Sequence, residues 1–200
     1  MTRRAGKKST SLFYIFTEGE VTEKQYFDKN SFGERPRADR KFPIINKGGR
    51  RGNDSKSMQM WVENTLSTVR IRKNDFVWIV IDKDENDPED LRALSDWCNQ
   101  KGYKLALSSP LFEFWFAIHF QYIEEAFNKE DIYECLNTRL GCRYNKTDDY
   151  KDILSNYTDA AIKNAKNLRK KIGRDQYCTH VPFTNVDRLV EDIRDFMRRG

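Results

Sequence analysis

Short apolar runs alternate with helix-like segments over the first half of the chain. Their length and their content of β-branched and aromatic residues predict strands, and they cover Leu12–Phe16, Phe42–Ile45, Phe76–Ile81 and Tyr103–Leu107. Helices are expected to follow caps at Thr22, at Asp54 or Ser55, and at Asp87. Strands that alternate with helices favour a parallel sheet with right-handed crossovers. The sequence therefore predicts an α/β fold with a four-stranded parallel sheet flanked by helices.

The second half of the chain is predicted to be mainly helical. Residues 111–120 are apolar all round, which is typical of a buried helix. The last helix is expected around Val186–Met197, with Thr184 or Asn185 as its cap. Because no linker is evident, we expect one domain over residues 11–200, with a core at 11–120 and a helical part at 121–200 packed on it. The basic residues 1–10 are expected to form a disordered tail.

Composition excludes several classes of protein. Charged residues make up 34% of the chain and aromatic residues 13%, which together indicate a folded protein with a strongly charged surface. The four cysteines include no Cys-x-x-Cys pair and there are two histidines, so a structural zinc site is not expected. The sequence shows neither a signal peptide nor an apolar stretch of membrane-spanning length. We expect a reduced, cytoplasmic protein without membrane contact.

Two short acidic clusters directly follow predicted strands. Glu18 and Glu20 come after the first strand, and Asp82, Asp84 and Glu85 come after the third. Ligands of such sheets bind beyond the carboxyl ends of the strands, where both clusters are expected to converge. Converging carboxylates repel one another unless a cation neutralises them, and their hard oxygens suit Mg²⁺ or Mn²⁺. Asp87 already serves as a helix cap, which leaves Asp82 and Asp84 available for a cation.

Glu113 and His119 interrupt the apolar segment at 111–120. A buried glutamate needs a partner, and the candidates are His119, a backbone donor or a lysine such as Lys146. Both a functional and a structural role remain open for Glu113. His119 is either a core histidine with a satisfied hydrogen bond or a catalytic residue.

A basic, glycine-rich segment lies between the second strand and the next helix. It contains Lys47, Arg50 and Arg51 beside three glycines, and such loops can cradle phosphate groups. Its spacing does not match a P-loop. Contact with a nucleic-acid backbone is therefore predicted, with an ordinary solvated surface loop as the alternative.

Several of these motifs resemble the RloB-like family, whose fold belongs to the wider Toprim group shared by topoisomerases, primases and some nucleases. The matching stretches run in order through nearly the whole chain and comprise Phe16–Phe27, Asn46–Gly49, Val77–Glu85, Ser109–Phe120, Tyr144–Lys146 and Asn185–Val186. The resemblance implies a Toprim-type site with Glu18, Asp82 and Asp84 as metal ligands, and a role in phage defence. Lys83 stands where the family often has arginine, so a bidentate phosphate contact is not expected there.

These observations lead to a main functional hypothesis and an alternative. The main hypothesis is a nuclease that depends on Mg²⁺ or Mn²⁺ and acts on RNA or DNA in anti-phage defence. The candidate catalytic residues are Glu18, Glu20, Asp82, Asp84, Glu113 and His119, and the candidate nucleic-acid contacts are Lys47, Arg50, Arg51, Lys83 and Lys146. Glu18 is either a metal ligand or a general acid or base. The alternative is a non-catalytic module that binds nucleic acid or a partner protein of a defence complex; a topoisomerase or primase is disfavoured because the chain is short.

Overall fold

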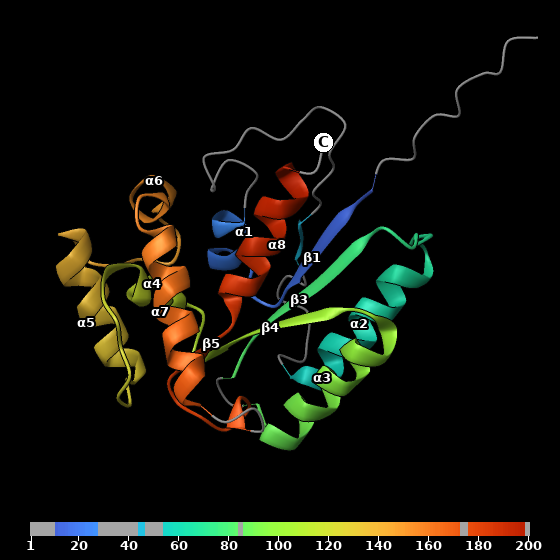
Figure 1. Cartoon of the computed structure of the whole chain (residues 1–200), viewed down its shortest axis with the longest axis horizontal. Coiled ribbons are helices and arrows are strands. Elements are labelled where there is room, and N and C mark those ends of the chain that lie inside the picture. Colours follow the sequence, from blue (N-terminus) through green and yellow to red (C-terminus); the bar gives the residue numbers. More distant parts are fainter. Residues whose placement is uncertain (1–10, 28–43, 47–53, 84–85, 173–175, 199–200) are drawn as a thin grey trace, which may run out of the picture.

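Five strands of the described chain form one sheet in the order β2-β1-β3-β4-β5 (Figure 1). The structure is a computed structural model, and it describes residues 11–27, 44–46, 54–83, 86–172 and 176–198. The strands are β1 (Phe13–Thr17), β2 (Ile44–Asn46), β3 (Phe76–Asp82), β4 (Lys104–Ser109) and β5 (Phe183–Thr184). Strands β1 to β4 pair in parallel, while β5 pairs antiparallel with β4. The predicted α/β fold is confirmed, and the two-residue β5 is an addition that the sequence pattern did not predict.

Eight helices are described. They are α1 (Thr22–Tyr26), α2 (Ser55–Ser67), α3 (Pro88–Lys101), α4 (Glu113–Phe120), α5 (Lys129–Leu140), α6 (Lys151–Ser155), α7 (Thr158–Lys171) and α8 (Val186–Arg198). Two of the predicted caps are present: the side chain of Asp54 accepts a hydrogen bond from the Ser57 amide, and that of Asp87 accepts one from the Glu89 amide. The predicted cap at Thr22 is wrong, because Val21 holds the N-cap position of α1 without a side-chain cap, and the Thr22 hydroxyl donates to Glu113 instead. The basic tail at residues 1–10 lies outside the described residues.

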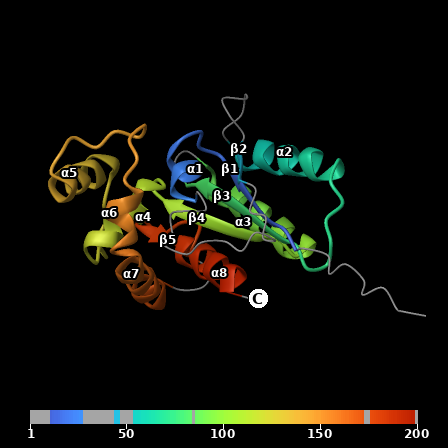
Figure 2. The same ribbon diagram turned by 90° about the horizontal axis from the view of Figure 1, so that it is seen from above.

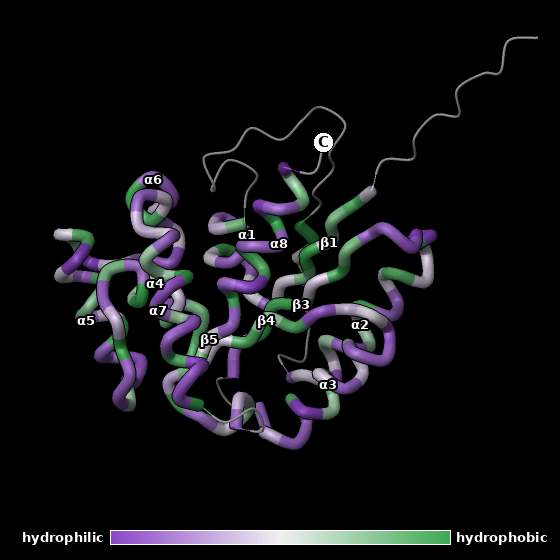
Figure 3. The backbone as a smooth tube through the Cα atoms, viewed as in Figure 1, coloured by the Kyte–Doolittle hydropathy of each residue, from purple (hydrophilic) through white to green (hydrophobic). Residues whose placement is uncertain are grey.

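The strands bury side chains on both faces of the sheet. Phe13 packs against Phe196 of α8, with ring centroids 5.2 Å apart, whereas Phe16 packs against Trp61 of α2 at 5.3 Å. These two positions differ by an odd number of residues, so they project to opposite faces. Figure 2 accordingly shows α2 and α8 on opposite sides of the strands. The strands are hydrophobic along most of their length, as expected for a parallel sheet covered on both faces (Figure 3).

The carboxyl-terminal helices contact both the sheet and one another. Helix α7 contacts α4, α8 and β5, and α8 contacts β4. Between α7 and α8, the guanidinium of Arg169 forms a bidentate ion pair with the fully buried Asp187, with Nη2 2.6 Å from Oδ2. The described helices include none that combines the length and apolarity of a membrane span.

Candidate functional site

The order of the strands places the two acidic clusters side by side. Because β1 and β3 are neighbours, Thr17 is in register with Val80, and the amide of Glu18 donates a hydrogen bond of 3.2 Å to the Val80 carbonyl. One step further, the amide of Asp82 donates a hydrogen bond of 3.5 Å to Oε2 of Glu18. Glu18 and Asp82 therefore converge, as the sequence predicted.

A third carboxylate, Glu23 of α1, lies in the same region. Its side chain turns back toward the end of β1, where Oε1 accepts a hydrogen bond of 3.2 Å from the Gly19 amide. The residue is only 4% exposed. A Cβ atom at position 19 would overlap the Glu23 carboxylate, so this arrangement requires glycine there.

The fourth carboxylate, Glu113, begins helix α4 and is 1% exposed. Its Oε1 atom accepts hydrogen bonds from the Tyr144 hydroxyl at 3.0 Å and from the Thr22 hydroxyl at 3.4 Å. It also pairs with Nζ of Lys146 at 3.1 Å, while the Lys146 side chain remains 53% exposed. Of the predicted partners of Glu113, the structure thus selects Lys146 and not His119. We refer to Glu18, Glu23, Asp82 and Glu113 as the carboxylate cluster.

Burial and repulsion from neighbouring carboxylates shift the pKa of two members of the carboxylate cluster, Asp82 and Glu23. Desolvation, followed by the charges of Glu23, Glu113 and Glu18, raises the pKa of Asp82 well above its usual range. Desolvation, reinforced by the charge of Glu113, raises the pKa of Glu23 to about 7. Burial of the ammonium group lowers the pKa of Lys146, but attraction to Glu113, Tyr133 and Asp82 together outweighs this cost and raises the pKa overall. The cluster therefore favours either bound protons or a bound cation.

Two buried oxygens of the carboxylate cluster lack a hydrogen-bond donor among the described groups. They are Oδ1 of Asp82 and Oε2 of Glu113. Such atoms are costly to bury unless a cation, a water molecule or a proton satisfies them, and their oxygen chemistry fits Mg²⁺ or Mn²⁺. Within the described ranges, however, no three carboxylate, imidazole or thiol groups are arranged so as to hold a metal ion. Asp84, the remaining member of the predicted ligand set, lies outside those ranges, so the metal site stays a prediction.

His119 lies in the aromatic core beside the site and is 1% exposed. Its Nδ1 atom is 2.8 Å from the Trp115 carbonyl, so it donates there, and Nε2 then accepts a hydrogen bond from the Tyr26 hydroxyl at 3.3 Å. Burial lowers the pKa of His119 to about 4, so the ring is neutral at pH 7. These contacts agree with the predicted alternative of a core histidine whose hydrogen bonds are satisfied.

The remaining candidates are placed as follows. Glu20 is exposed at the turn after β1. Nζ of Lys83 donates a hydrogen bond of 3.3 Å to the Thr179 carbonyl. Lys47, Arg50 and Arg51 lie outside the described residues, so the predicted phosphate-binding loop is not tested by the structure.

Glu23 is the residue that the sequence reasoning missed. It is buried because α1 directs its side chain back toward the end of β1, against Gly19. Its spacing of five residues from Glu18 was the available signal.

Comparison with known families adds a further observation to this geometry. The family model described as RloB-like protein matches residues 13–193, which is most of the chain. The chain belongs to the RloB-like family. The match includes all four members of the carboxylate cluster together with Lys146. No curated protein and no solved structure shows significant similarity to the chain.

Proposed function

We propose that this RloB-like protein is a nuclease that depends on a divalent metal ion and cleaves phosphodiester bonds in RNA or DNA. The observation that supports the proposal is the carboxylate cluster, in which burial and the charge of Glu113 raise the pKa of both Glu23 and Asp82. Buried carboxylates would repel a bound polyanion unless a cation lay between them and the phosphate. The role in anti-phage defence rests on the family resemblance and remains a prediction.

Glu18, Asp82 and Asp84 would hold the metal ion. A divalent ion bound there would polarise a phosphoryl oxygen and stabilise the charge that develops on it. Glu18 serves either as a ligand or as a general acid or base.

The other residues of the site have separate tasks. Glu23, with a pKa of about 7, can hold or release a proton near neutral pH. Lys146 reaches the cluster from solvent and is positioned to contact a phosphate of the substrate. Tyr144 and Thr22 orient the Glu113 carboxylate through their hydroxyl groups.

The decisive experiment compares cleavage of end-labelled RNA and DNA with Mg²⁺ or Mn²⁺ by the parent protein and by Glu18→Gln, Asp82→Asn and Glu23→Gln. Each substitution should lower the cleavage rate by about a hundredfold or more, whereas Glu125→Gln, at an exposed glutamate, should not change it. Binding of Mn²⁺ measured by calorimetry supplies a readout independent of activity and should be lost in Asp82→Asn. Nucleic-acid binding without cleavage in any metal would contradict the proposal and favour the non-catalytic module. Cleavage retained in all three variants would place the active site elsewhere.

A further inference from the structure

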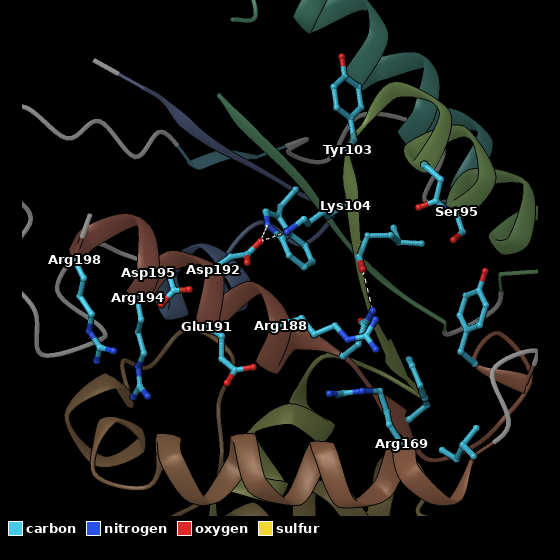
Figure 4. Close-up of a pocket in the computed structure, with 17 residues that line it drawn as sticks. Ser95, Tyr103, Lys104, Arg169, Arg188, Glu191, Asp192, Arg194, Asp195 and Arg198 are labelled. Carbon is cyan, nitrogen blue, oxygen red and sulfur yellow. Dashed lines mark hydrogen bonds and ion pairs between the residues drawn. The ribbon is translucent and has the colours of Figure 1, made fainter. Parts of the chain in front are cut away.

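A large cavity lies on a different part of the molecule from the carboxylate cluster. Its volume is about 1030 Å³, at the upper end of the range for ligand sites. It is lined by the amino-terminal part of β4 and by residues of α3, α7 and α8 (Figure 4). The carboxylate cluster, by contrast, follows the carboxyl ends of β1 and β3.

The strand that lines this cavity is paired on its outer edge over only part of its length. Strand β5 is short and is in register with Ser108 and Ser109 alone. Next to β5 along this edge, the side-chain amide of Asn185 takes the place of a strand residue. Its Nδ2 atom donates a hydrogen bond of 3.0 Å to the Leu105 carbonyl, and its Oδ1 atom accepts a hydrogen bond of 2.6 Å from the Leu107 amide. The carboxamide of Asn185 thus makes the two hydrogen bonds that one residue of a parallel strand would make to Leu105 and Leu107 of β4.

The next position along the same edge is open. Since the Leu105 carbonyl points away from β3, the Leu105 N–H points the same way, and so does the carbonyl of Tyr103 two residues earlier. Among the described residues neither group has a hydrogen-bond partner, and both residues line the cavity. A donor and an acceptor with this spacing match the backbone of one residue in an added strand.

The charges around the cavity favour a peptide over a nucleic acid. Most of the charged side chains on its wall already have partners: Lys104 pairs with Asp192, Glu191 with Lys166, Arg194 with Asp159 and Arg169 with Asp187. Glu191, Asp192 and Asp195 of α8 stand among the five basic side chains of the wall, so the cavity offers no continuous basic surface to a phosphate backbone.

Arg188 is a further basic residue of this wall. It is exposed, extends from α8 toward the middle of the cavity (Figure 4), and has no ion pair with any described residue. A single carboxylate of an incoming peptide would complement it.

We infer that this cavity binds an extended peptide segment of a partner protein, which adds a strand to the open edge of β4 and places an acidic side chain against Arg188. The backbone groups of Tyr103 and Leu105 supply affinity that is independent of sequence, and Arg188 selects the acidic residue. This inference does not depend on the proposed nuclease activity.

The test uses a phage-displayed library of random peptides, selected against the full-length protein. Selected peptides should share an acidic residue at one position. The binding of a selected peptide, followed by fluorescence anisotropy, should weaken about tenfold in Arg188→Glu, and changing the shared acid of the peptide to lysine should restore binding to that variant. The absence of a shared acid, or unchanged binding to Arg188→Glu, would overturn the inference.

Backbone recognition is tested by methylating successive amide nitrogens of the selected peptide. Methylation of the residue opposite Lys104 should abolish binding, while methylation of its immediate neighbours should be tolerated, because alternate residues of an added strand face the edge. Hydrogen exchange of the Leu105 amide should slow in the complex. Tolerance of methylation at every position, or displacement of the peptide by single-stranded RNA or DNA of the same length, would overturn the inference. Asp82→Asn should bind the peptide as tightly as the parent, which separates this site from the carboxylate cluster.

Discussion

The Gly19 amide donates a hydrogen bond to Oε1 of Glu23, and the space beside this glycine is filled by the same carboxylate. The main-chain turn after β1 and the buried charge of α1 therefore depend on each other. A methyl group at position 19 has no room unless Glu23 moves.

We predict that Gly19→Ala lowers the free energy of unfolding by about 1–3 kcal/mol, because the added Cβ overlaps the Glu23 carboxylate. The measurement is chemical denaturation of the variant and the parent. The same substitution in a Glu23→Ala background should cost less, since the obstructing carboxylate is then absent. An equal cost in both backgrounds would contradict the predicted overlap.

The raised pKa of Glu23 predicts a pH-dependent stability. Below its ordinary pKa of 4.5, Glu23 is protonated in both the folded and the unfolded chain. Between pH 4.5 and about 7 the unfolded chain releases this proton while the folded protein retains it, so the free energy of unfolding falls as the pH rises. Without metal, Glu23→Gln should therefore be more stable than the parent at pH 8 by roughly 3 kcal/mol and similar to it at pH 4.

This prediction is checked by calorimetric melting at a series of pH values in the presence of a chelator. A stability difference between the parent and Glu23→Gln that stays constant from pH 4 to pH 8 would contradict it.

The ion pair between Lys146, in the loop after α5, and Glu113 of the carboxylate cluster is predicted to contribute to the free energy of unfolding. Lys146→Met leaves the buried Glu113 without its cation and should destabilise the protein by about 1–2 kcal/mol, less than a fully buried pair because Lys146 is half exposed. In a Glu113→Gln background, Lys146→Met should be nearly neutral. Urea denaturation of the four proteins gives the coupling energy, and a value near zero would show that the pair does not stabilise the fold.

The pair of Arg169 and Asp187 predicts a larger effect at the junction of α7 and α8. Arg169→Met leaves the fully buried Asp187 uncompensated and should cost about 3–5 kcal/mol. Lys166→Met removes an ion pair between the same two helices at the surface and should cost less than about 1 kcal/mol. Thermal melting distinguishes the two variants, and equal effects would contradict the role assigned to burial.

The parts of the fold that depend on local signals were predictable from the sequence. The apolar runs predicted β1 to β4, and Asp54 and Asp87 predicted the starts of α2 and α3, because a strand in a covered sheet and a capped helix each leave a pattern within a few residues. The convergence of Glu18 and Asp82 followed from the rule that parallel strands end at one edge.

The features that the sequence did not predict depend on tertiary packing. Strand β5 has two residues, too few to show the alternation of apolar and polar residues that marks a strand in a sequence. The burial of Glu23 depends on where α1 lies against the end of the sheet, and the partners of His119 come from α1 and α4 together. The apolar stripe of α8 predicted that this helix packs on the core. The polar residues of α8 line the cavity, and their spacing in the sequence does not indicate what lies around them.

The side-chain amide of Asn185 has a consequence for how the sheet ends. A regular sixth strand beside β4 would need its own connection, whereas here one residue next to the start of α8 satisfies the Leu105 carbonyl and the Leu107 amide and lets the chain turn directly into a helix. Replacing this asparagine with any residue that lacks a carboxamide would expose a longer unpaired edge, of the kind through which folded domains aggregate. The Asn185 carboxamide thus limits the open stretch of this edge to the Tyr103 carbonyl and the Leu105 amide.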